Sequence, residues 1–389
     1  MTLRTPSAPR VDRLGILLGL AVLAALGAMP FVVFKANRIV SGSARSLYEA
    51  LPPAAAVAVA ALLTLVAATG ALVANARVRL AAAVAGIVVV AFALAAAADA
   101  LTPAGNRIVR VSPGVGCWVL LLAVALLATD ALARLRPGPR ARVACLALAG
   151  AVLYAALAHG TFDNLSVMRE YAVNASSFGR EARQHVLLAL GSLGGAIVVG
   201  LPLGILCHRV ARLRGAILQI LNLIQTIPSI ALFGVLMVPL GALASAVPLA
   251  AALGVAGIGA APAVVALFLY ALLPVVASTT VGLGRVSPAV VDAARGMGLT
   301  DRQVLVQVEL PLALPVIVTG IRIVLVQNIG LVTVAALIGG GGFGTFVFQG
   351  VGQTAIDLVL LGAIPTVALA FSSAVVLDAV VDAMNRTTS

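Results

Sequence analysis

The residues with the most informative spacing lie in one polar stretch, 287–311, which separates two apolar segments and reads SPAVVDAARGMGLTDRQVLVQVELP. Ser287 followed by Pro288 suits the start of a helix, because a proline at the first helical position has no N–H to leave unpaired. Gly296 and Gly298 are predicted to end this helix, since glycine tolerates the left-handed conformation that closes one.

A second short helix is predicted directly after that turn. Thr300 and Gln303 have the spacing of a capping box, in which each side chain bonds the backbone of the other residue. Pro311 limits how far this helix continues without a kink. The chemistry that two such helices offer is docking of another protein, and a solvated connecting loop is the simpler alternative.

The spacing of seven residues favours the docking site. They are Asp292, Ala293, Ala294, Gly298, Val308, Leu310 and Pro311. The run resembles the EAA signature of ABC importer permeases, E-A-A-x3-G-x9-I-x-L-P, with Asp292 in place of Glu and Val308 in place of Ile. The resemblance implies a helix that couples to a cytoplasmic ATP-hydrolysing subunit. That partner would bind ATP and Mg²⁺, and this chain would hold no cofactor and no catalytic residue.

The composition is that of a polytopic membrane protein. Of the 389 residues, 62% are hydrophobic and only 10% are charged, whereas soluble proteins have about 25% charged residues. No alternating ten-residue pattern suggests a barrel, so the predicted fold is all-α. The net charge of +12 comes from arginines in short loops beside apolar segments. These arginines indicate orientation in a membrane rather than binding of nucleic acid.

Apolar runs predict about ten membrane-spanning helices, because about 20 apolar residues cross a bilayer as a helix. The expected spans are 14–34, 54–74, 80–98, 116–133, 143–159, 185–207, 215–243, 260–283, 316–338 and 355–384.

The distribution of basic residues predicts which loops face the cytoplasm. When alternate loops are assigned to that side, it receives roughly twice as many Lys and Arg residues as the other side. We therefore expect a multi-pass protein of the inner membrane, with both termini and the 287–311 stretch in the cytoplasm. The loop after the first span, with Lys35, Arg38 and Arg45, runs against this rule.

Three regions are expected along the chain. Residues 1–160 would form an N-terminal membrane region of about five helices, and 161–184 a polar external linker. Residues 185–389 would form an importer-type permease core with its coupling loop at 284–315. The polar stretch could instead lie as an amphipathic helix on the outer surface or extend the sixth span.

Polar residues inside the predicted spans are candidates for a solute path, because they are costly in lipid unless they pair or line a cavity. The candidates are Asn222, Gln225, Thr226, Pro228, Gln327 and Asn328. Asn222 and Thr226 share one helix face, and Pro228 is expected to kink the helix. A helix-packing seam held together by amide side chains is an equally good interpretation of the first group.

Other residue patterns argue against an enzyme. The three histidines, His159, His185 and His208, stand at span ends without metal-ligand spacing, so no metal site is expected. The glycine run 339–342 is not followed by Gly-Lys-Ser/Thr, so it is no phosphate loop and is expected to form a tight outer turn or re-entrant segment. Acidic residues near the end of the last span leave an ion- or proton-coupled secondary transporter as the alternative function.

Three segments narrow the resemblance. QTIPSIALFG, the run from Asp292 to Pro315, and LVTVAALIGGGGFGTFVFQG are similar to permeases of glycine betaine, choline and carnitine importers, the osmoprotectant family. Within that family, the extra N-terminal spans resemble the Yeh-type permease. The resemblance implies a cytoplasmic ATPase, a periplasmic or lipid-anchored substrate-binding protein, and a second permease copy or sister permease. The predicted spans of the core offer Tyr270 and scattered Phe but no aromatic cage for a quaternary ammonium, so we expect a separate receptor to select the solute.

Overall fold

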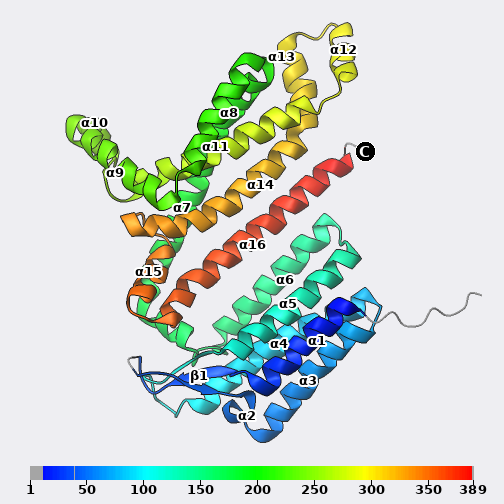
Figure 1. Cartoon of the computed structure of the whole chain (residues 1–389), viewed down its shortest axis with the longest axis vertical. Helices are drawn as coiled ribbons and strands as arrows, with labels where there is room; N and C mark the ends of the chain where they lie inside the picture. Colours follow the sequence, from blue (N-terminus) through cyan, green and yellow to red (C-terminus); the bar gives the residue numbers. More distant parts are fainter. Residues whose placement is uncertain (1–11, 39, 388–389) are drawn as a thin grey trace, which may run out of the picture. The chain divides into compact units, whose positions relative to one another are not determined.

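The computed structural model describes residues 12–38 and 40–387 and consists of helices with one small sheet (Figure 1). Nine of the described helices are long and apolar enough to cross a membrane, and a tenth, shorter apolar helix precedes them. This confirms the predicted all-α polytopic fold of about ten spans. The chain forms two compact units, one of residues up to 138 plus 149–173, the other of residues 139–148 plus those from 174 onward.

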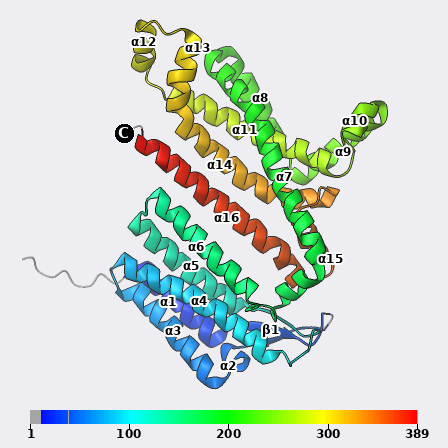
Figure 2. The same ribbon diagram turned by 180° about the vertical axis from the view of Figure 1, so that it is seen from behind.

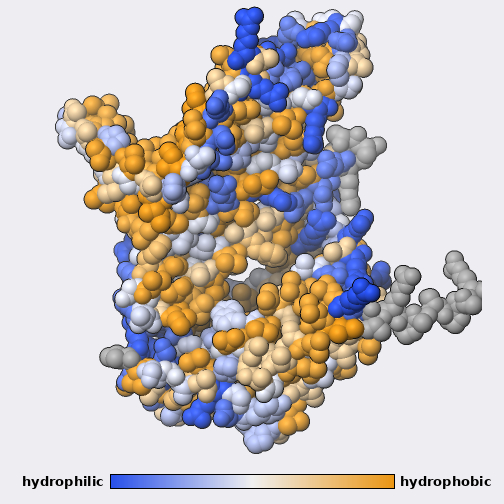
Figure 3. Space-filling model, in the orientation of Figure 1, coloured by the Kyte–Doolittle hydropathy of each residue, from blue (hydrophilic) through white to orange (hydrophobic). Residues whose placement is uncertain are grey.

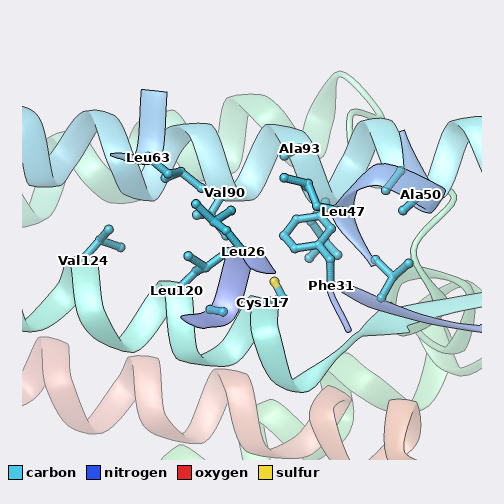
Figure 4. Packing of buried hydrophobic residues seen from close by; sticks show 14 of the residues in the cluster. Leu26, Phe31, Leu47, Ala50, Leu63, Val90, Ala93, Cys117, Leu120 and Val124 are labelled. Carbon is cyan, nitrogen blue, oxygen red and sulfur yellow. The ribbon is translucent and has the colours of Figure 1, made fainter. Parts of the chain in front are cut away.

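The first unit is built from apolar helices joined by short polar loops. Its helices are α1 (Arg13–Ala28), α2 (Leu47–Ala50), α3 (Pro53–Leu72), α4 (Ala76–Leu101) and α5 (Val115–Leu135), together with parts of α6 (Pro139–Ala158) and α7 (Ser166–Arg209). Leu26, Leu63, Val90 and Leu120 come from four different helices and meet in one core (Figure 4). Contacts between α1, α3, α4 and α5 therefore determine the shape of this unit.

A three-stranded antiparallel sheet, which the sequence patterns did not predict, lies at one end of the first unit. The strands β1 (Val32–Lys35), β2 (Ser43–Arg45) and β3 (Arg110–Pro113) pair in the order β2-β1-β3. They come from the loop after α1 and from the loop between α4 and α5. The basic residues of the first loop, which run against the positive-inside rule, thus lie in or beside an ordered sheet.

A buried ion network joins three segments at the opposite end of the helices. Arg79 of α4 pairs with Asp12 at the start of α1 and, at 2.8 Å, with Asp130 of α5. Arg134 contacts both carboxylates as well. The Arg79 side chain is almost fully buried, and a buried charge is tolerated only when it is paired.

The second unit contains the rest of α7 and all later elements (Figure 2). They are α8 (Ala211–Thr226), α9 (Ser229–Ala246), α10 (Pro248–Ala252), α11 (Ala260–Gly284), α12 (Pro288–Gly296), α13 (Asp301–Gln303), η1 (Val304–Glu309), α14 (Leu310–Ala335), η2 (Ala336–Ile338), α15 (Gly344–Gly352) and α16 (Ile356–Thr387). The long helix α11 is central, with contacts to α8, α9 and α14, and α14 also packs on α15 and α16. Hydrophilic residues gather at the end of this unit that contains α12 and α13, whereas the sides of its long helices are largely hydrophobic (Figure 3).

Two predicted boundaries differ from the structure. The expected span at 215–243 is interrupted, because α8 ends at Thr226 and α9 begins at Ser229. Pro228, which cannot donate a backbone hydrogen bond, therefore separates two helices instead of bending one. Residues 161–184, expected to form a polar linker, are helical from Ser166 and continue into the next span within α7. This matches the alternative that the sixth span is extended.

Candidate coupling site and solute path

The polar stretch folds as two helical segments around a glycine turn. Ser287 occupies the N-cap of α12, although its side chain makes no capping hydrogen bond. Gly298 has a φ of +86°, a conformation that favours glycine. Thr300 and Gln303 form the predicted capping box, in which the Thr300 N–H donates to the Gln303 side chain at 2.9 Å.

One face of α12 is available to a partner. Asp292 has a side chain that is 76% exposed, and Ala293 and Met297 are exposed beside it. Ala294 faces the other way and is buried. The small Ala293 leaves the backbone of α12 accessible, so this face can enter a cleft in another protein.

Surface ion pairs brace the glycine turn. Arg295 lies 3.9 Å from Asp292 and 3.2 Å from Asp301, which stands on the far side of the turn. All three side chains are about half exposed or more, so each pair contributes little to stability, about 0–1 kcal/mol. The turn geometry thus depends mainly on Gly298 and the capping box.

A π-helical turn links the second segment of the loop to α14, and the sequence patterns did not indicate it. The backbone N–H of Leu310 donates to the carbonyl of Leu305, five residues earlier. The proline that follows, Pro311, has no N–H to continue the ordinary α-helical pattern. Single π turns inside helices occur often at functional sites.

The last residues of the motif attach the loop to the membrane helices. Leu310 packs against a cluster formed by Leu283 of α11 with Ala313 and Ile317 of α14. Val308 is half-buried and Pro311 is exposed. The motif therefore divides into an exposed part on α12 and an anchoring part at the start of α14.

A buried carboxylate inside the motif makes a short polar contact with α7. Glu309 lies between Val308 and Leu310, its side chain is 5% exposed, and it accepts a hydrogen bond from the guanidinium of Arg209 at 2.6 Å. Arg209 is the last residue of α7. Glu309 is the only acidic residue in the otherwise uncharged run VLVQVELP, which was the available signal, but nothing in the sequence indicates its partner.

The candidate path residues on α8 face in different directions. Asn222 and Thr226 are exposed, and the Thr226 hydroxyl donates to the carbonyl of Leu223 in its own helix. Gln225 is half-buried and donates to the carbonyl of Tyr270 in α11 at 2.7 Å. The Tyr270 hydroxyl in turn donates to the carbonyl of Ile227, at the break before α9.

The candidate residues on α14 pack toward α7. Asn328 is completely buried and donates through its Nδ2 to the hydroxyl of Ser192 at 2.9 Å, while its Oδ1 has no hydrogen-bond partner among the described residues. Gln327 is half-buried. The contacts described for the two groups lead to different helices, α11 and α7, and no described contact joins the groups.

The glycine run forms a turn that is held by polar side chains of α7. Gly339, Gly341 and Gly342 all have positive φ. Glu181 accepts hydrogen bonds from the N–H of Gly342 at 2.7 Å and from the hydroxyl of Thr345. Gln184 also donates to the carbonyl of a glycine of this run, Gly340, at 3.1 Å. These contacts make a tight turn before the short helix α15, as expected.

His185 joins the same turn to α14 and is fully buried. Its Nε2 lies 3.0 Å from the carbonyl of Ile329, and its Nδ1 accepts from the N–H of Phe343 at 3.2 Å. Because a carbonyl can only accept, Nε2 carries the proton and the ring is neutral in this arrangement. This histidine therefore fastens the turn, and in the described part of the chain no group of His, Cys, Asp and Glu could hold a metal.

Both halves of the chain match known families. Residues 12–168 match the N-terminal domain of the ABC transporter permease YehY, and residues 196–389 match the binding-protein-dependent transport system inner membrane component. The osmoprotectant import permease protein OsmW of Salmonella typhimurium is 42% identical over 191 residues, which cover 49% of this chain and 84% of that protein. The chain belongs to the ABC importer permeases.

A relative from another organism agrees with this assignment. The glycine betaine/carnitine/choline transport system permease protein OpuCD of Bacillus subtilis is 37% identical over 201 residues, which cover 51% of this permease and 81% of OpuCD. Among solved structures, a chain from an inward-facing conformation of the MetNI methionine ABC transporter is similar to this permease at 23% identity and a TM-score of 0.45. The alignment covers 53% of this permease and 95% of the MetNI chain. The permease is a membrane subunit without a cofactor of its own, and the ATPase activity of such importers lies in a separate subunit.

Proposed function

We propose that this permease moves small osmoprotectants of the glycine betaine, choline and carnitine class into the cell, driven by a partner ATPase that binds its coupling loop (residues 284–315). The substrate class is supported by relatives whose names specify osmoprotectant, glycine betaine, carnitine and choline transport. Selection would be made by a periplasmic or lipid-anchored binding protein, and a second copy or a sister permease would complete the pore.

The geometry of α12 carries the coupling role. An exposed face with Asp292 and Ala293 stands at the end of the second unit, where hydrophilic residues gather. At the other end of the loop, Glu309 is paired with Arg209 and Leu310 is packed against the membrane helices. A push on α12 would therefore reach α7 through the Glu309–Arg209 ion pair and α14 through the packing of Leu310. The permease supplies no catalytic group to ATP hydrolysis.

We assign the solute path to the side of α8 that carries Asn222 and Thr226, with the break at Pro228 as its narrow point. Gln225 supports that break by bonding α11. Asn328 would add a polar group to the path if its Oδ1, which has no hydrogen-bond partner among the described residues, became accessible during the cycle. Contacts of this weak, distributed kind let a solute leave as readily as it enters.

The test uses the permease reconstituted in liposomes with its ATPase and binding protein. Labelled glycine betaine, choline and carnitine should accumulate only when ATP is supplied on the ATPase side. Asp292→Lys should abolish association with the ATPase and uptake, because it reverses a charge on the docking face.

Asp301→Lys is the matched control, since Asp301 is 79% exposed and also pairs with Arg295 but lies outside the motif. Equal loss in both variants would contradict the assignment of the docking face. Uptake that persists without the ATPase and follows an ion gradient would instead support a secondary transporter.

A further inference from the structure

A cavity at the sheet end of the first unit has the charges of a small-molecule site. Its volume is about 820 Å³, and it lies between the loop after α4 and the start of α7. The charged and polar residues that line it are Asn106, Arg107, Arg110, Asp163, Asn164, Arg169 and Tyr171. None of these residues belongs to the coupling loop or to the candidate path.

Positive charge exceeds negative charge around this cavity. Glu170, the carboxylate nearest to its arginines, is buried and shared between Arg38 at 3.5 Å and Arg110 at 3.8 Å. The Nε of Arg110 is buried and has no hydrogen-bond partner among the described residues. Arg107 is exposed, and Arg110 and Arg169 are half-buried. An excess of positive charge around a cavity is stabilised by an anion, so this cavity favours a ligand with an anionic group.

The frame of the cavity is held rigidly by Arg169. Its guanidinium donates to the carbonyls of Val109 and Asn106 and, at 2.9 Å, to the side chain of Asn164. The side chain of Asn106 accepts from two backbone N–H groups of its own loop. A frame fixed in this way lowers the entropy cost of binding a ligand.

Two side chains of opposite charge in the cavity lining make no described polar contact. The guanidinium of Arg107 and the carboxylate of Asp163 have no hydrogen-bond or ion-pair partner in residues 12–38 and 40–387. One can receive an anion and the other a cation. Tyr171 adds an aromatic side chain, a surface that attracts ammonium groups.

We propose that this cavity binds a zwitterion that carries an anionic group and an ammonium, with Arg107 receiving the anionic group. This inference rests on the proposed function, because betaine-type solutes have this chemistry. It adds a site in the first unit, outside the permease core. The headgroup of phosphatidylethanolamine shares the same chemistry, so the source of the zwitterion is either a free solute or the membrane.

The experiment measures binding of glycine betaine by calorimetry to the purified full-length chain, without ATPase or binding protein. Arg107→Gln should weaken binding about tenfold or more, the effect of losing a charge-assisted hydrogen bond. Arg77→Gln is the matched control, since Arg77 is exposed, is unpaired among the described residues and lies at the start of α4, and it should bind like the wild type. Choline lacks the carboxylate. Its affinity for the wild type should therefore be no higher than the affinity of betaine for Arg107→Gln.

A second arm identifies the source, by mass spectrometry of lipid that co-purifies with each variant. Betaine binding that depends on Arg107 supports the site with a free solute. Absent betaine binding, combined with phosphatidylethanolamine retained by wild type and Arg77→Gln but lost from Arg107→Gln, supports the site with a lipid. Measurable and equal binding of choline and betaine, or no effect of Arg107→Gln in either arm, overturns the proposal.

The two proposals fail separately. Binding is measured without the ATPase, so a wild-type complex that takes up no betaine would overturn the proposed transport function and leave the cavity site standing. Wild-type binding by Arg107→Gln would overturn only the cavity site.

Discussion

Gly298 lies at the turn between the two segments of the coupling loop. Glycine is needed at this position because of its backbone conformation and not because of the space around it. Its φ is +86°, yet an added Cβ would meet no atom of the described residues within 4 Å. A side chain here would therefore strain the backbone by about 1–2 kcal/mol without any clash. The turn that orients α12 would relax, while the membrane helices would keep their packing.

We expect Gly298→Val to lose most ATP-driven uptake while the protein still accumulates in the membrane. Its thermal stability in detergent should fall only slightly, because the strain is relieved within the turn. Uptake and ATPase co-purification measure the first effect, and a melting curve measures the second. Gly296→Ala is the control, because Gly296 is helical and also has open space around it. Normal coupling in Gly298→Val would show that the turn is dispensable.

At this scale the sequence predicted local bonds well and distant partners poorly. The Thr300–Gln303 capping box and the role of Gly298 depend on neighbours within a few residues, so spacing alone was sufficient. Glu309 is separated from Arg209 by 100 positions, and one sequence contains no signal for such a pair. The Oδ1 of Asn328 has no partner within the described part of the chain, and this too could be seen only with the helices in place.

Among the elements, the junction of α7, η1 and α14 depends on the Arg209–Glu309 pair. We expect Arg209→Gln to lower the free energy of unfolding by about 2 kcal/mol, less than for a fully buried pair because Arg209 is about one-third exposed. The double variant Arg209→Gln with Glu309→Gln should recover most of this stability, since no uncompensated carboxylate remains.

In the Arg209 and Glu309 variants, the uptake per ATP hydrolysed should change differently from the free energy of unfolding. If the ion pair transmits movement, the double variant stays impaired in uptake per ATP hydrolysed although its stability returns. Arg295→Gln, which removes only exposed pairs, should change stability by less than about 1 kcal/mol. Full recovery of both readouts in the double variant would reduce the pair to a structural role.

The short helix α15 lies against α14 at a point where only glycine fits. A Cβ on Gly344 would lie 2.0 Å from the carbonyl oxygen of Thr333. We expect Gly344→Ala to lower stability by about 1–3 kcal/mol, the usual cost of overpacking. A melting curve tests this, with Gly352→Ala at the open end of α15 as control. Equal melting temperatures would contradict the close packing.

Elements that depend on the length of an apolar run could be predicted from the sequence. Elements that depend on tertiary contacts could not. Long apolar runs gave the spans, because lipid leaves a crossing chain few alternatives to a helix. The π turn before Pro311 and the sheet formed by β1, β2 and β3 involve short segments whose bonds are decided by neighbours. The break at Pro228 was predicted as a kink because proline permits either outcome.

For the whole molecule, the orientation of the loops remains a prediction with a direct test. In a variant without Cys117, Cys145 and Cys207, single cysteines replace Ser41, beside the sheet, and Ser287, before α12. A membrane-impermeant maleimide should label Ser41→Cys on intact cells and Ser287→Cys only after the membrane is opened. The reverse pattern would place α12 outside and remove it from the reach of an ATPase.

Polar contacts join α7 to α14 and to the segments just before and after α14. They occur at both ends and in the middle of the length over which these segments run together. Arg209 bonds Glu309, Ser192 bonds Asn328, His185 bonds Ile329, and Glu181 bonds Gly342. Sliding or twisting either helix against the other would break these bonds together. Ser192, His185, Asn328 and Glu309 are all buried, so water cannot readily replace the lost bonds. The two helices should therefore behave as one rigid body throughout a transport cycle. Alternating access would then require a hinge elsewhere, and the two residues between α8 and α9, Ile227 and Pro228, are placed to provide it.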